Sequence, residues 1–94
     1  MMFANKIRQL REERELLQRH VSAALDVDNA MYCKIERGER RAKREQVVKL
    51  AELLQVESKE LLTLWLADQV NAVVANENEL ANSVLDVVRK NYLK

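Results

Sequence analysis

Four side chains in one short stretch have the chemistry to contact the edges of nucleic-acid bases, and they belong to Asn29, Ala30, Cys33 and Lys34. If Tyr32 and Ile35 pack inward, the helical repeat turns all four outward on one face. An amide can pair with adenine through two hydrogen bonds, and an ammonium can donate to the acceptors of guanine. A methyl group or a thiol can touch the methyl of thymine. Each residue alone is more typical of an ordinary surface, but their grouping on one face beside a cationic loop favours contact with bases.

A dense run of cations accompanies this stretch. Residues 1–49 carry 12 Lys and Arg against 8 Asp and Glu, whereas residues 50–94 carry 4 against 7. The formal net charge of +1 hides this asymmetry, which favours a phosphate-binding face on the first half. A solvated charged surface is the alternative for the asymmetry taken alone. The cations that we expect to contact the DNA backbone are Arg40, Arg41, Lys43 and Arg44. Arg37, at the end of the outward-facing stretch, is also expected to contact DNA.

Apolar spacing predicts an all-α chain, and the lack of proline with a single glycine agrees with it. Asp28 should cap the helix of residues 29–37, and Gly38 fits the left-handed position after it. Asp26 falls in the tight turn before that helix. The other helices are expected near residues 3–15, 18–25, 43–54 and 78–92, with one of about 17 residues after Glu57 or Ser58.

The composition offers little for catalysis. One glycine cannot form a phosphate-binding loop, and one histidine with one cysteine cannot build a structural zinc site. We expect no enzyme activity, cofactor or metal. The single cysteine points to a reducing, cytoplasmic compartment, and the interrupted apolar stretch Leu61–Val70 is too short to cross a membrane. The sequence shows no effector pocket, which suggests control by concentration.

The expected fifth helix is apolar over more than one stripe, so it needs a partner besides the core. The candidate dimer interface consists of Leu64, Trp65, Val73 and Val74. Trp65 fits an interface and a core position equally well. We place a DNA-binding domain at residues 1–62 and a helical extension, for dimerisation or partner binding, at residues 63–94.

Residues 6–62 resemble the Cro/repressor-type helix-turn-helix family, also called XRE. The carrying segments are Ile7–Arg11, Gln18, Val21–Leu25, Ile35–Gly38, Val47–Leu54 and Glu60–Leu62. The chain departs from the family pattern at Asp26, where glycine is usual, at Ser22, where alanine is favoured, and at Ala42, where proline is common.

The resemblance implies a five-helix lambda-repressor-like domain whose second and third helices form the motif. It implies a phosphate or base contact from Gln18, base contacts from the four residues named first, and an ion pair between Arg11 and Glu36. The tail resembles small regulators encoded beside restriction–modification genes.

Two functions follow as hypotheses. The first is a homodimeric transcriptional regulator of double-stranded DNA, acting on a palindromic operator and controlling its own gene. The alternative is an antitoxin-type interaction protein whose helical tail binds a second protein.

Overall fold

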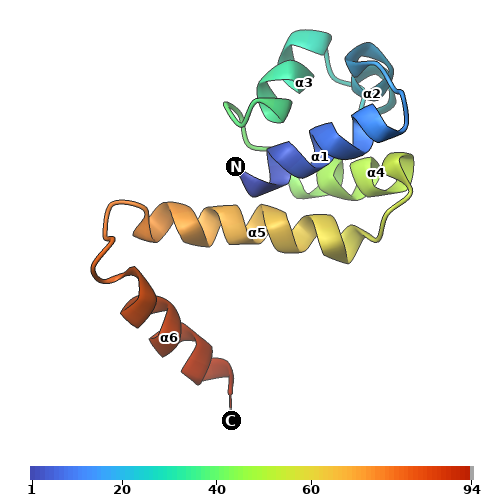
Figure 1. Cartoon of the computed structure of the whole chain (residues 1–94). Coiled ribbons are helices and arrows are strands. Elements are labelled where there is room, and N and C mark those ends of the chain that lie inside the picture. Colours follow the sequence, from blue (N-terminus) through green and yellow to red (C-terminus); the bar gives the residue numbers. More distant parts are fainter. Residues whose placement is uncertain (94) are drawn as a thin grey trace.

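The computed structural model describes residues 1–93, which form six helices and no strand (Figure 1). This confirms the all-α prediction, with helix ends within a few residues of those expected. The helices are α1 Met2–Glu13, α2 Gln18–Ala24, α3 Asn29–Glu36, α4 Arg44–Leu54, α5 Ser58–Val74 and α6 Ala81–Tyr92.

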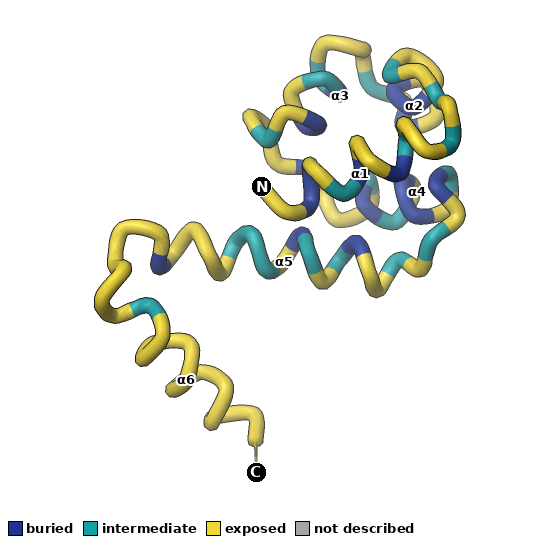
Figure 2. The backbone as a smooth tube through the Cα atoms, in the orientation of Figure 1, coloured by how far each residue is buried: buried dark blue, intermediate teal, exposed yellow. Residues whose placement is uncertain are grey.

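The first five helices share one hydrophobic core. Each contributes at least one side chain with 0% exposure: Ile7, Val21, Tyr32, Leu50 and Leu61. In Figure 2 the buried backbone gathers where α1, α4 and α5 face one another, with α2 and α3 packed above them. Removal of this apolar surface from water is the main force that holds the short helices together.

Four of the helices end in the same left-handed turn, although only one glycine is available. The left-handed residues are Glu15, Asp26, Gly38 and Gln55, with φ between 55° and 76°. In each turn the next residue donates its N–H to a carbonyl five positions earlier, as Val27 does to Ser22 at 3.0 Å. Three of these turns therefore contain a side chain in a conformation that costs L-residues about 1–2 kcal/mol.

Helix α5 is tied to the rest of the body well beyond residue 62. The Asp68 carboxylate accepts hydrogen bonds from the backbone N–H groups of Met2 and Phe3, both at 3.0 Å, and so caps the start of α1. The Trp65 indole donates to the carbonyl of Ala42 at 2.8 Å. The division expected at residue 62 thus falls inside a continuous helix that packs against α1 and α4.

Helix α6 differs from the other five because none of its residues is buried. It leads away from the end of α5 and lies apart from the helical body (Figures 1 and 2). Its apolar residues Val84, Leu85 and Val88 are 40–48% exposed. Within residues 1–93, no helix is both long enough and apolar enough to cross a membrane.

Candidate nucleic-acid interface

A tight turn joins α2 to α3 at the end of the molecule far from α6 (Figure 1). Asp26 adopts the left-handed conformation, with φ 57°, that reverses the chain after α2. Two residues later, the Asp28 carboxylate accepts a hydrogen bond from the Met31 N–H at 2.7 Å. This confirms the predicted N-cap and fixes where α3 begins.

Helix α3 has one buried face and one exposed face. Tyr32, Ile35 and Glu36 are 0%, 2% and 5% exposed. The opposite face carries most of the residues expected to contact bases: Asn29, Ala30 and Lys34 are exposed, and Cys33 is half-buried. Met31, which the sequence did not single out, is half-buried beside them.

The carboxylate of Glu36 is the centre of a polar cluster that joins three helices. Arg11 of α1 binds it with two hydrogen bonds, Nε to Oε2 at 2.9 Å and Nη2 to Oε1 at 2.8 Å. The ion pair that the family resemblance implied is therefore present, with side chains only 13% and 2% exposed. Arg11 also donates to the carbonyl of Leu16 at 2.8 Å, so one guanidinium fastens both α3 and the segment before α2.

Gln18 extends this cluster to α2. Its amide donates to Glu36 at 3.2 Å and accepts from the Cys33 thiol at 3.2 Å. The Gln18 side chain is thus committed within the protein, whereas the resemblance implied a contact to DNA. One amide N–H and one lone pair of the amide oxygen remain for a DNA contact. The backbone N–H of Gln18 at the start of α2 also remains suited to a phosphate.

The cluster keeps Glu36 charged. Burial disfavours ionisation of its carboxyl, but the hydrogen bonds and charge of Arg11, with smaller contributions from the Tyr32 hydroxyl and the Gln18 amide, outweigh burial and lower its pKa. The buried Tyr32 hydroxyl has no hydrogen-bond partner within residues 1–93, and burial followed by the nearby Glu36 charge raises its pKa. Tyr32 therefore stays neutral beside the ion pair.

His20 has a structural position that the sequence did not suggest. Its Nδ1 accepts a hydrogen bond from the Leu17 N–H at 3.2 Å, so it helps to close the first turn of α2. The available signal was its place three residues after the N-cap, where a Gln or Glu more often does this.

The expected phosphate contacts lie on and around the loop between α3 and α4. Arg37, Arg40, Lys43 and Arg44 are exposed, and Arg37 pairs with Glu39 at 2.7 Å. Arg41 is also exposed but stands over the Trp65 ring, 4.7 Å from its centre. All five cations are thus exposed, and Arg41 differs from the other four because it is stacked on Trp65 of α5.

The expected dimer residues occupy two different environments. Trp65 and Val74 are buried within the chain at 9% and 6% exposure, and Leu64 is half-buried against the core. Only Val73, at 79% exposure, is free. The helical repeat explains the difference, because Leu61 and Trp65 define the face of α5 that packs inward. The exposed apolar stripe of α5 lies elsewhere, at Leu66, Val70 and Val73.

Comparison with known proteins gives a family for this geometry. A helix-turn-helix family model matches residues 7–61, which is more than half of the chain and covers α2, α3 and α4, most of α1 and the first turn of α5. No curated protein and no solved structure matched the chain. The family consists of DNA-binding transcription regulators, and its two-helix motif coincides with α2 and α3. The chain belongs to the Cro/C1-type helix-turn-helix family, also called XRE.

Proposed function

We propose that this regulator is a homodimer that places α3 of each copy in successive major grooves of a palindromic operator. The observation that carries the proposal is the division of α3 into two faces. Tyr32, Ile35 and Glu36 hold the helix to the body, and this leaves Asn29, Ala30 and Lys34 free to meet base edges.

The base contacts would come from the first and middle turns of α3. Asn29 offers both a donor and an acceptor, as pairing with adenine requires, and Lys34 offers an ammonium to guanine. Ala30 and the half-buried Cys33 suit a thymine methyl. Backbone contacts from Arg37, Arg40, Lys43 and Arg44, and from Arg41 when it leaves the Trp65 ring, would fix the register without adding sequence preference.

The dimer would form through the apolar side chains that the single chain leaves uncovered. They follow one stripe on α5 and one on α6: Leu66, Val70 and Val73, with Val84, Leu85, Val88 and Tyr92. No residue of α6 is buried in its own chain, which is expected of a helix whose partner is a second copy. Two-fold symmetry would then set half-sites about 34–36 Å apart.

A footprint on the DNA beside the chain's own gene tests the operator and self-regulation together. We expect protection of two inverted half-sites, since small regulators of this type would control their own level. Lys34→Ala should cost about 1–3 kcal/mol at one or two base pairs. Lys59→Ala, which removes an exposed cation at the start of α5, is the matched control and should bind normally. An equal loss on all DNA sequences would make Lys34 a backbone contact instead.

Sedimentation of two α6 variants tests the dimer. Both variants introduce aspartate, one on the apolar stripe and the other away from it. Val84→Asp together with Val88→Asp charges the α6 stripe and should yield monomers. Asn82→Asp adds a charge to an exposed position on the opposite side of α6 and should leave the mass unchanged. If the wild-type chain is itself monomeric, the uncovered stripe favours the second candidate function, in which α6 binds a different protein.

A further inference from the structure

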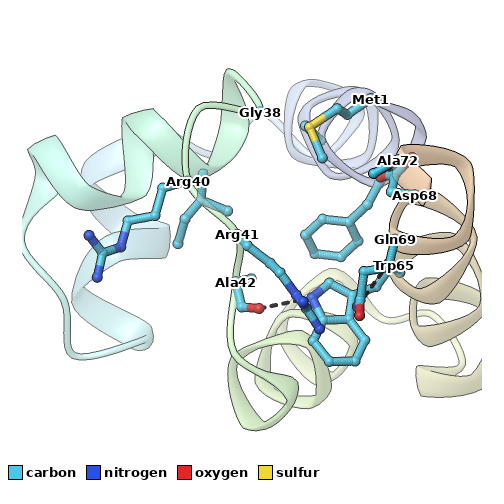
Figure 3. A pocket seen from close by; sticks show the side chains of 12 residues that line it. Met1, Gly38, Arg40, Arg41, Ala42, Trp65, Asp68, Gln69 and Ala72 are labelled. Atoms are coloured by element: carbon cyan, nitrogen blue, oxygen red, sulfur yellow. Dashed lines mark hydrogen bonds between the residues drawn. The ribbon is translucent and has the colours of Figure 1, made fainter. Parts of the chain in front are cut away.

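A half-open cavity of about 270 Å³ lies between α1, the α3–α4 loop and α5 (Figure 3). It is independent of the exposed face of α3, although it shares Arg41 with the basic loop. No local pattern in the sequence indicates such a pocket, because its walls come from three separate segments of the chain. Its lining includes Phe3, Ala4, Ile35, Ala42, Trp65 and Ala72.

The walls of this cavity are mainly apolar, and two cations, Arg40 and Arg41, lie at its edge. Figure 3 shows the Arg40 guanidinium directed away from Trp65. Arg41 lies over the Trp65 ring and forms no ion pair or hydrogen bond through its side chain within residues 1–93. Asp68, the acidic group of the lining, already accepts two backbone N–H groups at the start of α1. Gln69 donates to the Trp65 carbonyl at 3.3 Å. Of the two arginines in the lining, Arg41 is therefore the one placed to donate to a ligand inside the cavity.

We infer that this cavity binds a small aromatic carboxylate, with the ring between Phe3 and Trp65 and the carboxylate on Arg41. An apolar slot with one convergent charged group is the usual composition of a small-molecule site. The volume lies just below the range of about 300–1,000 Å³ that is typical for drug-sized ligands, so it suits a single ring. A guanidinium with free N–H groups selects a carboxylate over a neutral or cationic group.

Occupation of the cavity would also affect the loop that flanks α3. Arg41 either stacks on Trp65, holds the ligand or reaches out to a DNA phosphate, and it cannot do all three. A bound carboxylate would therefore compete with DNA for this one cation and weaken DNA binding. This second step rests on the proposed function, whereas binding of the ligand does not.

Trp65 is the sole tryptophan of the chain, so its emission reports on the cavity directly. Phenylacetate is the probe, and the full chain is used without DNA. Trp65 is excited at a wavelength that phenylacetate does not absorb. We expect a saturable change in emission and a rise in melting temperature at saturating phenylacetate. The neutral analogue 2-phenylethanol should bind about tenfold or more weakly, because it lacks the charge that pairs with Arg41.

Two variants of the cavity and one control variant separate binding at this site from a general effect of the probe. Arg41→Met should abolish the preference for phenylacetate over 2-phenylethanol, since the charge is gone while the walls remain. Ala72→Leu should fill the cavity and prevent binding of both probes. Ala75→Leu adds the same group to an exposed position of the chain outside the cavity and should bind as wild type does.

Each outcome decides the inference. A linear, non-saturating change in emission, equal affinity for the two probes, or an Ala72→Leu variant that binds normally would overturn it. In a separate arm, saturating phenylacetate should weaken operator binding by the wild type but not by Arg41→Met. Failure of the wild type to bind any DNA would overturn the proposed function, and the emission titration would still decide the ligand site.

Discussion

Helices α3 and α6 lie at opposite ends of the molecule and differ in whether their apolar side chains are buried. Helix α3 turns Tyr32 and Ile35 into the core and keeps its exposed face largely polar. Helix α6 turns nothing inward and exposes an apolar stripe that includes Val84 and Val88. The first arrangement is complete within one chain. The second leaves an apolar stripe in water, as surfaces that contact another molecule typically do.

The charged groups of α3 and α6 also differ in burial and in whether they bind other helices. Glu36 of α3 is held by two other helices through Arg11 and Gln18. The one ion pair of α6 within residues 1–93 joins Asp86 to Lys90 on the helix's own surface, with side chains 57% and 73% exposed. Such an exposed pair contributes at most about 1 kcal/mol, so it stabilises α6 only slightly. The orientation of α3 is therefore set by buried groups, and that of α6 is left to its surroundings.

The largest effect should come from breaking the buried ion pair. Arg11→Met leaves the Glu36 carboxylate buried without its cation, and we expect a loss of about 3–5 kcal/mol in the free energy of unfolding. Urea denaturation followed by circular dichroism measures it. The double variant Arg11→Met with Glu36→Met should recover most of the loss, because no buried charge then remains.

Arg8→Met is the matched control for this experiment. Arg8 also pairs with a glutamate, Glu12, at 2.9 Å, but both side chains are more than half exposed. Its removal should cost about 0.5 kcal/mol or less. Equal losses for Arg8→Met and Arg11→Met would mean that the Glu36 cluster does not fix α3.

The same truncation on the core and on α6 sharpens the contrast between them. Leu54 is 0% exposed and Leu85 is 40% exposed. Leu54→Ala should lower the free energy of unfolding by about 2–5 kcal/mol at any protein concentration. Leu85→Ala should change it by less than about 0.5 kcal/mol in dilute solution, as surface substitutions do. A loss that grows with protein concentration for Leu85→Ala would indicate that the stripe is covered by a second copy.

Acid should remove the contribution of the Glu36 cluster. The pKa of Glu36 is lowered from its ordinary value of 4.5 by folding, so the folded state favours the ionised carboxylate. Its contribution is present above pH 4.5 and is lost as the pH falls below that value, through the folded pKa. Acid should therefore lower the free energy of unfolding of the wild type more than that of the double variant Arg11→Met with Glu36→Met, which lacks this carboxyl. A difference that is constant from pH 7 to pH 3 would contradict the lowered pKa.

The helices and the motif were predictable from sequence because they depend on local patterns. Apolar spacing locates the helices, and Asp28 and Gly38 mark the two ends of α3 by their own backbone and capping chemistry. The exposed positions of α3 followed from the inward placement of Tyr32 and Ile35.

The features that escaped prediction depend on contacts between distant segments. Spacing could not decide whether Trp65 faces the core or a partner, because its indole N–H finds its acceptor 23 residues earlier, at Ala42. The hydrogen bonds of Asp68 to the start of α1 and the cavity beside Arg41 arise in the same way. The commitment of Gln18 to Glu36 was also hidden, since an amide near a helix start suits DNA and protein equally.

The smallest predicted effect concerns the left-handed turns, which occur throughout the body and set the angles between its helices. Gln55 ends α4 with φ 58°, and its turn directs the chain into α5. Gln55→Gly should raise the free energy of unfolding by about 0.5–1 kcal/mol, because relief of the left-handed strain exceeds the added entropy of the unfolded chain. Asp26→Gly in the turn before α3 should gain less, since aspartate tolerates this conformation better than glutamine does. Parallel urea titrations measure both gains, and a loss for Gln55→Gly would mean that its side chain holds the turn in place.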